Sequence, residues 1–244
     1  MHRLISTTHA LRYLKRLPNS SSGAIVVTCS DGKEYVLKYK ANEQSAYGTS
    51  VLIAEYLCYL LAVHYGLPIP RASIVHVGRE LAESIHEDEL RQKLKNSIGN
   101  NFGSEMLKRV IEVSGSMLTP VDDGQFCRFP YLVIPIFILS SILYGFDQYI
   151  YNRDRMWQNP NILYIPKDRT IRIIDHSMAI WHILDYSENI LEHYDGKDHV
   201  MYKHVKYPGE WSGMMKRRSA PDIKVYFPPE PGQPVKVDNL SSLR

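Results

Sequence analysis

The sequence predicts a protein of the α+β class, and three observations support this. Short runs rich in β-branched and aromatic residues lie between residues 24 and 77 and are typical of strands. Two long apolar segments, 51–65 and 131–146, have the length and composition of helices. A pair of short apolar runs joined by a turn follows at 162–174 and predicts a hairpin. With 244 residues, 44% of them hydrophobic, the chain can form one large domain or a unit of two lobes.

The first predicted elements are strands arranged around one strong turn. Residues 1–18 mix basic and apolar positions, which fits a first strand or a short helix. Residues 24–29 (AIVVTC) predict a strand by their β-branched content. Asp31-Gly32 suits the positive φ angles of a hairpin turn, and residues 34–40 (EYVLKYK) then predict the returning strand. A further strand is predicted at 72–77.

Residues 51–65 predict a long apolar helix, and Gly66 supplies its C-terminal stop. Glu55 is the only acidic residue of this helix. A carboxylate among apolar residues needs a partner if it is buried, and Lys38 on the preceding strand is the candidate. The alternative is a partly exposed Glu55, with Lys38 as one of several surface lysines.

The middle and the end of the chain are less regular. Charged residues 79–96 predict a solvated helical insertion, and the glycine-containing stretch 98–106 falls where a connector between two lobes would lie. Residues 107–113 predict a helix, a turn follows at Asp122-Asp123-Gly124, and another helix is expected at 181–194. Six prolines in residues 206–235 leave little room for regular structure there.

The segment 131–146 (YLVIPIFILSSILYGF) raises the question of a membrane span. It is slightly short for one and Pro135 interrupts it, so we expect a helix buried within the domain. The formal net charge of +3 argues neither for nucleic acid nor for a membrane surface. The N-terminus shows no export signal, and the three cysteines suit a reducing compartment because they are few and widely spaced. We therefore expect a cytoplasmic protein.

The stretch 146–179 carries the candidate functional residues. Asp154 is followed five residues later by Asn159, two short apolar runs come next, and the second run ends on Asp175. Phosphoryl transfer needs an oxygen base near the acceptor hydroxyl and acidic or amide oxygens that hold magnesium. Asp154 would orient the acceptor, and Asn159 and Asp175 would bind the metal, in the order found in protein-kinase-like folds. The alternative is a surface hairpin in which Asp and Asn serve the turns.

Asn161 competes with Asn159 for the role of metal ligand. It directly precedes Ile162-Leu163, and in many protein kinases the metal-binding Asn directly precedes such an apolar pair. The chain leaving Asp154 has a fixed reach, however, and a separation of five residues is shared across kinase relatives. We therefore predict that Asn159 binds the metal and that Asn161 stabilises the loop.

The ordered set of segments resembles the compact HipA-like kinases, relatives of the HipA serine/threonine kinase toxins. The resemblance covers residues 3–185 and rests on SSSGAIVVTCSDGKEYVLKYK, LIAEYLCYLLAVHYGLPIPRASIVHV, NNFGSEML, FDQYIYNRDRMWQNPNIL and RIIDHSMAI. It implies a two-lobed, protein-kinase-like fold around ATP and magnesium. Residues 1–106 would form a β-rich N-lobe, and residues 107–244 a small helical C-lobe with the catalytic loop and the proline-rich tail.

The resemblance also implies a role for each candidate residue. Lys38 would contact the ATP phosphates with Glu55 as its helix partner, Asp154 would be the catalytic Asp, and Asn159 and Asp175 would bind Mg²⁺.

The loop before Ala24 would cover the phosphates and would bind them through Ser21, Ser22 and Gly23. This chain departs from the family pattern: Met156 stands where the larger members carry a His, and this loop has only one glycine. Serine hydroxyls and backbone amides would then bind the phosphates.

These observations predict an ATP- and Mg²⁺-dependent kinase that transfers the γ-phosphoryl group to a Ser or Thr hydroxyl. A toxin or stress-response role, with an antitoxin-like protein partner, is implied by the resemblance alone. Two other functions stay open: a pseudokinase that binds nucleotide or only a partner protein, and a kinase acting on a small molecule or a lipid headgroup. The complete set of candidate residues favours a kinase over a pseudokinase, whereas nothing in the sequence identifies the acceptor.

Overall fold

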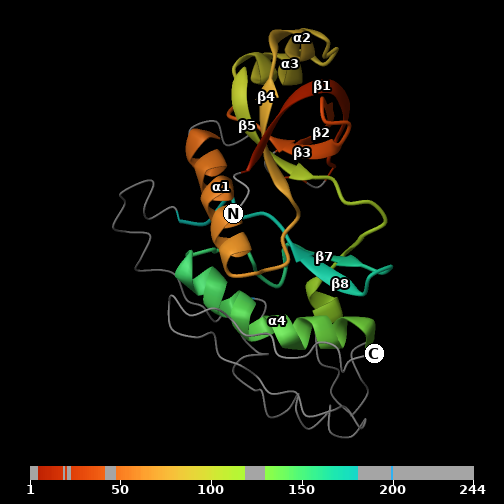
Figure 1. The fold of residues 1–244 in the computed structure, drawn as a ribbon, viewed down its shortest axis with the longest axis vertical. Helices are drawn as coiled ribbons and strands as arrows, with labels where there is room; N and C mark the ends of the chain where they lie inside the picture. Colours follow the sequence, from red (N-terminus) through yellow and green to blue (C-terminus); the bar gives the residue numbers. More distant parts are fainter. Residues whose placement is uncertain are drawn as a thin grey trace, which may run out of the picture.

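The computed structural model describes residues 5–18, 20, 23–41, 48–118, 130–180 and 199. It is a mixed α and β structure with a β-rich region in its first half. Figure 1 shows a barrel of strands at one end of the long axis, with a smaller sheet and a long helix toward the other end. The turn at Asp122-Asp123-Gly124, the helix expected at 181–194 and the proline-rich stretch 206–235 lie outside the described residues.

Five strands form a closed barrel in the order β1-β2-β3-β5-β4. The first strand closes it, because it pairs antiparallel with β2 and parallel with β4. The predictions of strands at 24–29, 34–40 and 72–77 are confirmed, and residues 1–18 contain a strand rather than a helix. The bounds are β1 (Ser6–Arg16), β2 (Ile25–Cys29), β3 (Glu34–Lys38), β4 (Ala72–Val77) and β5 (Gly99–Glu105).

The fifth strand corrects the prediction of a lobe connector at 98–106. β5 lies between β3 and β4 and pairs with both. Gly103 allows close packing, because a Cβ there would lie 2.4 Å from Cγ2 of Val75, whereas Gly99 has a φ of 108°. The sequence alone does not distinguish a glycine that permits close approach from one that permits bending.

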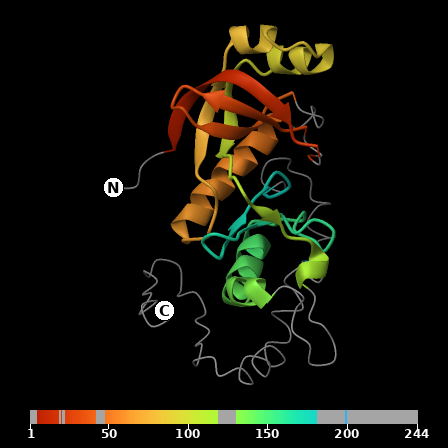
Figure 2. The ribbon, with the colours of Figure 1, turned by 90° about the vertical axis from the view of Figure 1, so that its right-hand side faces the viewer.

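The insertion at 79–96 forms two short helices, α2 (Arg79–Glu83) and α3 (Asp88–Lys95), at one end of the barrel (Figure 2). It is not simply solvated, which corrects the prediction. Leu81, Leu90 and Leu94 are buried in the same hydrophobic cluster as the barrel residues Leu37 and Val75. The charged residues of α3 lie on its other face. Because charged residues outnumber the leucines in this segment, the sequence predicted a solvated helix and not one that covers the end of the barrel.

The predicted helix at 51–65 is confirmed as α1 (Gly48–His64). Gly66 ends it in the left-handed region, with φ of 68°. Several small or apolar residues of α1, including Ala54 and Cys58, join a second hydrophobic cluster with Leu143 and Ile162. The helix therefore connects the barrel to the smaller sheet and the long helix.

The smaller sheet has the order β6-β7-β8 and packs near the helix α4 (Pro130–Tyr149). The predicted hairpin is confirmed as β7 (Ile162–Ile165) and β8 (Thr170–Ile173). The predicted helix at 107–113 is wrong, because Ile111 and Glu112 form β6 and pair with β7. Non-local pairing here outweighs local helix propensity. The short 3-10 helix η2 (Gly115–Leu118) follows β6.

The segment 131–146 lies within α4, as expected for a helix. Among the helices that the structure describes, none has the length and hydropathy that a membrane span requires.

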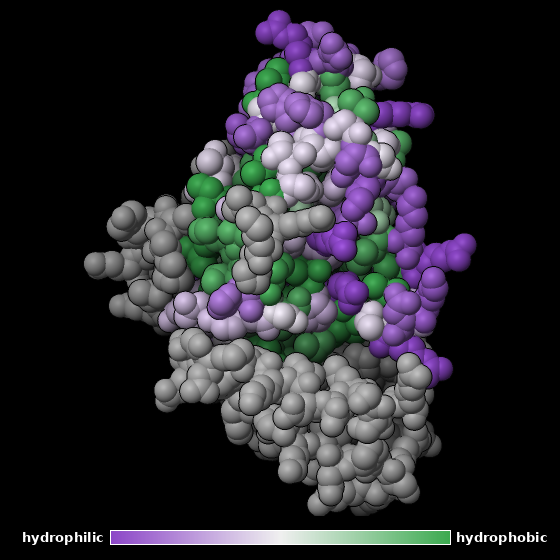
Figure 3. Space-filling model, viewed as in Figure 1, coloured by the Kyte–Doolittle hydropathy of each residue, from purple (hydrophilic) through white to green (hydrophobic). Residues whose placement is uncertain are grey.

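The helix α1 presents apolar side chains outward as well as inward. Ile53, Leu57, Leu60 and Val63 are each 38–44% exposed and recur at helical spacing. Figure 3 shows hydrophobic residues gathered on the side where α1 lies in Figure 1. This explains why the sequence of α1 is apolar almost throughout.

Candidate active site

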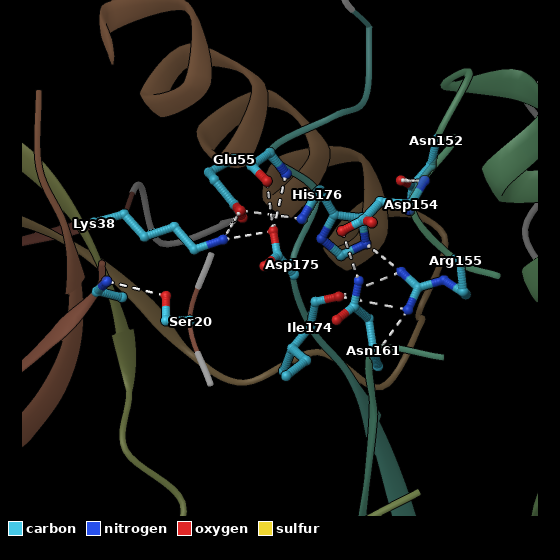
Figure 4. A network of polar contacts seen from close by, with 12 residues as sticks. Ser20, Lys38, Glu55, Asn152, Asp154, Arg155, Asn161, Ile174, Asp175 and His176 are labelled. Carbon is cyan, nitrogen blue, oxygen red and sulfur yellow. Dashed lines mark hydrogen bonds and ion pairs between the residues drawn. The ribbon is translucent and has the colours of Figure 1, made fainter. Parts of the chain in front are cut away.

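Lys38 lies at the end of β3, and its ammonium group bonds two carboxylates. Its Nζ lies 2.5 Å from Oε1 of Glu55 and 2.6 Å from Oδ1 of Asp175 (Figure 4). Burial alone would lower the pKa of Lys38, but the carboxylates of Asp175 and Glu55 outweigh it and raise the pKa. Lys38 is therefore a cation at neutral pH. Because Lys38 and Glu55 form a buried ion pair, the alternative that both are surface residues is wrong.

Glu55 connects α1 to the segment that follows β8. It is 4% exposed, and the Oε1 that bonds Lys38 also accepts the backbone N–H of His176 at 3.0 Å. Burial raises the pKa of Glu55, and both donors oppose this effect. A single carboxylate oxygen thus receives donors from two segments that are far apart in the sequence.

Asp175 is held in a left-handed backbone conformation, with φ of 56°. Its Oδ1 accepts hydrogen bonds from Lys38, from the Ser177 hydroxyl at 2.7 Å and from the Ser177 backbone N–H at 3.2 Å. Burial alone would raise the pKa of Asp175, but Lys38 and Ser177 outweigh it and lower the pKa, so the carboxylate is ionised. Within the described residues no donor bonds Oδ2, and this oxygen is available to a cation.

Asp154 lies in the loop between α4 and β7, where two Asn side chains contact it. Nδ2 of Asn161 donates to Oδ2 of Asp154 at 3.0 Å, and the Asn159 side chain also forms a hydrogen bond with Asp154. Burial raises the pKa of Asp154, and the nearby Asp175 carboxylate raises it further, against the effects of Lys38 and the two amides. The structure therefore brings all five predicted polar residues into one region.

A fully buried ion pair, which the sequence did not predict, lies next to Asp154. Nε of Arg155 lies 2.6 Å from Oδ2 of Asp147, and both side chains are 0% exposed. Asn152 donates to Oδ1 of Asp147 at 2.9 Å, and Nε2 of His199 lies 2.9 Å from Oδ2. Opposite charges close to a long apolar segment were the available signal, because a charge in such a place needs a buried partner.

The remaining N–H groups of Arg155 reach three backbone carbonyls and one ring. Nη1 donates to Pro160 at 3.1 Å and to Asn161 at 2.8 Å, and both terminal nitrogens lie 3.4 Å from the carbonyl of Ile174. Nη2 lies 3.1 Å from Nε2 of His176. Arg155 thus joins the chain entering β7 to the chain leaving β8.

His176 itself is buried and neutral. Burial, with the Arg155 guanidinium, lowers the pKa of His176 to about 3. The ring is therefore uncharged at neutral pH and accepts a hydrogen bond from Arg155.

The loop between β1 and β2 is only partly described. Gly23 has a φ of 66°, and its N–H donates to the carbonyl of Ser20 at 3.0 Å. The Ser20 hydroxyl accepts the backbone N–H of Ala24, and the Tyr39 hydroxyl donates to the carbonyl of Gly23. Ser21 and Ser22 lie outside the described residues, and their contact with phosphate stays a prediction.

The donor chemistry of the site fits magnesium and a phosphate chain. Carboxylate and amide oxygens suit Mg²⁺, which prefers oxygen ligands and keeps several waters. An ammonium group has three N–H donors, and two acceptors for Lys38 are found among the described residues, which leaves one donor for a phosphate oxygen. The described part of the chain places no group of three or more His, Cys, Asp or Glu to hold a metal.

Comparison with known families matches residues 11–207 to a family described as HipA-like kinase. The matched region covers most of the chain and includes Lys38, Glu55, Asp154, Asn159 and Asp175. Searches of curated proteins and of solved structures found no match.

Breaking the buried ion pair should strongly destabilise the protein. Asp147→Asn leaves the Arg155 cation buried without its counter-ion, which typically costs about 3–5 kcal/mol. Urea unfolding followed by circular dichroism measures this loss. The matched control is Glu89→Gln on α3, which removes the ion pair of the exposed Glu89 carboxylate with Lys93 and should change the stability far less.

The loss should also depend on pH. Burial alone would raise the pKa of Asp147, but Arg155 and His199 outweigh it and lower the pKa to about 2. Because the folded pKa lies below the unfolded one, the carboxylate contributes stability above the unfolded pKa and loses it as the pH falls through about 2. The difference between wild type and Asp147→Asn should therefore shrink between about pH 4 and pH 2. A difference that is constant over this range, or no larger than that of the control, would contradict the assignment.

Proposed function

The chain belongs to the HipA-like kinase family, and we propose that it is an ATP- and Mg²⁺-dependent kinase that transfers the γ-phosphoryl group to a Ser or Thr hydroxyl. The observation that carries this proposal is the contact of Lys38 with both Glu55 and Asp175. The three side chains come from β3, from α1 and from the segment after β8. One buried cation is thus shared by two carboxylates, next to a third carboxylate on Asp154.

In this proposal Lys38, Glu55 and Asp175, which we call the Lys38–Glu55–Asp175 group, bind the nucleotide phosphates and the metal. Glu55 orients the ammonium, whose remaining N–H donates to a phosphate oxygen. Asp175 holds Mg²⁺ through its free Oδ2, and Asn159 adds an amide oxygen. One cation between two carboxylates leaves a net negative charge, which attracts a divalent cation. Bound Mg·ATP supplies the phosphoryl group and the metal charge that its transfer requires.

Asp154 is the proposed catalytic Asp. Its carboxylate orients the acceptor hydroxyl and takes its proton as the hydroxyl oxygen attacks the γ-phosphorus of ATP. The bond from this phosphorus to the β–γ bridging oxygen breaks, and ADP leaves. The raised pKa of Asp154 supports this role, because a more basic carboxylate is a better proton acceptor. The hydrogen bonds from Asn159 and Asn161 stabilise its position.

We also propose the two-lobed, protein-kinase-like arrangement, with residues 1–106 as the N-lobe and residues 107–244 as the reduced C-lobe. The hydrophobic cluster within the barrel and its cap supports an N-lobe with a core of its own. The second cluster lies around α4, β7 and β8 and also includes residues of α1, so α1 of the proposed N-lobe packs against the proposed C-lobe. Lys38 comes directly after Leu37, a β3 residue of the barrel cluster. Asp154 precedes β7 and Asp175 follows β8, the two strands of the second cluster.

The biological setting is proposed from the family alone. A cytoplasmic location, a toxin or stress-response role and an antitoxin-like protein partner all belong to this part of the proposal. Incubation with γ-labelled ATP and Mg²⁺ in a cell lysate tests the acceptor class. Label in a protein, on Ser or Thr by mass spectrometry, supports the proposal. Label only in a lipid extract or in small molecules contradicts the Ser/Thr acceptor, and equal labelling by Asp154→Asn contradicts the catalytic assignment.

Lys38 and Glu55 should act as one unit in phosphoryl transfer. Lys38→Ala should lower the rate by about a hundredfold to a thousandfold, as for other single donors that stabilise a transition state. Glu55→Gln should lower it by misplacing Lys38, so the double variant should be little slower than Lys38→Ala. Transfer rates from labelled ATP measure the cycle.

Lys33→Ala is the control, because Lys33 forms a half-exposed pair with Glu105 on the barrel. Its rate should equal that of wild type. Wild-type rates in both Lys38→Ala and Glu55→Gln would show that the assignment of β3 and α1 to the phosphate site is wrong.

Substitutions of Asn159 and Asn161 should differ in their effect on the Mg²⁺ concentration that the reaction requires. Asn159→Ala should lower activity and raise the Mg²⁺ concentration needed for half-maximal rate, because it removes a ligand. Asn161 has a φ of 52°, and its carbonyl accepts from Arg155, so Asn161→Ala should act mainly on stability. Asn161→Gly is the matched control, since glycine adopts positive φ without strain. A raised Mg²⁺ requirement in Asn161→Gly, with none in Asn159→Ala, would reverse the assignment.

A further inference from the structure

His176 contacts Glu55, the partner of Lys38, and Arg155, the neighbour of Asp154. It directly follows Asp175 and is 1% exposed. Its backbone N–H donates to the Glu55 oxygen that bonds Lys38, and its ring nitrogen Nε2 lies 3.1 Å from Nη2 of Arg155 (Figure 4). One residue therefore touches the partner of Lys38 on one side and the neighbour of Asp154 on the other.

The contact with Arg155 determines which ring nitrogen carries the proton. A guanidinium group has N–H donors and no acceptor. Nε2 of His176 must therefore accept, and the proton of the neutral ring must lie on Nδ1. Replacing the ring with a side chain that has no acceptor would remove this contact from a buried, charged donor.

A second ring restricts how the imidazole can turn. Phe146 of α4 meets the ring of His176 nearly edge to face, with centroids 6.1 Å apart and planes at 80°. Phe146 in turn packs against Tyr65, with centroids 6.4 Å apart. The imidazole thus lies between an aromatic ring and a guanidinium, and its acceptor points to the latter.

We propose that His176 is a positioning residue for the kinase reaction. Its ring acceptor orients the Arg155 guanidinium, while its backbone N–H orients Glu55. The Lys38–Glu55–Asp175 group and Asp154 thereby keep one placement relative to each other. The catalytic consequence rests on the proposed function, whereas the hydrogen bond itself does not.

Two substitutions separate the acceptor from the packing of the ring. His176→Phe keeps an aromatic ring against Phe146 but gives Arg155 no acceptor. His176→Gln loses the ring but offers a carbonyl oxygen that a long, unbranched side chain can direct to Arg155. If His176 served only to fill space, the Phe variant would keep more activity than the Gln variant. If its ring acceptor positions Arg155, the Gln variant should keep more activity.

The test measures phosphoryl transfer from labelled ATP in the full-length chain. His176→Phe should lower kcat about a hundredfold, the order of effect of a displacement of 1 Å at a reacting centre. Its KM for ATP should change little, because Lys38 still binds the phosphates. His176→Gln should regain at least about a tenth of the wild-type kcat. His76→Gln on β4 is the control and should change neither constant, since His76 is outside the site and contacts Asn100.

The ring tautomer of wild-type protein supplies a second readout that needs no activity. Long-range proton–nitrogen NMR of the imidazole should show Nδ1 protonated and Nε2 unprotonated. A protonated Nε2 would overturn the proposal even if neither variant folds. Equal losses of kcat in the Phe and Gln variants would also overturn it. Wild-type protein with the expected tautomer and no transfer of label would overturn the proposed function and the catalytic role of His176 together, but not the hydrogen bond.

Discussion

The buried ion pair between Arg155 and Asp147 is the interaction on which the geometry of the site depends. Both side chains are fully removed from solvent, so each charge must be satisfied by the protein. Arg155 meets this demand with bonds to a carboxylate, three backbone carbonyls and a ring nitrogen. These acceptors lie on α4, before β7 and after β8. Satisfying one guanidinium therefore fixes the loop of Asp154 against the segment of Asp175.

Lys38 is a second buried cation that needs carboxylate partners, and it lies on β3 of the barrel. Its strand, β3, pairs with β2 on one side and with β5 on the other, within a closed barrel of five strands. The two carboxylates that bond Lys38 reach it from α1 and from the chain after β8. Glu55 also accepts from His176, which contacts Arg155. The two buried cations, Lys38 and Arg155, are thus linked through Glu55 and His176.

Local sequence patterns predicted much of this structure. The β-branched runs, the Asp31-Gly32 turn, the apolar helix with its Gly66 stop and the 162–174 hairpin are all present, because each is specified by adjacent residues. β5 and β6 were missed since their strand identity depends on pairing with distant partners. Lys38 and Glu55 could be paired from the rule that a buried acid needs a counter-ion. The Arg155–Asp147 pair was not predicted, although opposite charges close to the apolar segment 131–146 indicate that a buried pair is possible. Ser21 and Ser22 lie outside the described residues.

We propose above all that Lys38, Glu55 and Asp175 together bind the phosphates of a magnesium-bound nucleotide. Calorimetric titration with a non-hydrolysable ATP analogue, with and without Mg²⁺, tests it most directly. We predict saturable binding to the wild-type protein that weakens sharply in Lys38→Ala. Asp175→Asn should lose the strengthening that Mg²⁺ gives to the wild type, because its metal-facing oxygen no longer carries a charge. Absence of binding to the wild type, or equal Mg²⁺-dependent binding by the wild type and both variants, would contradict the claim.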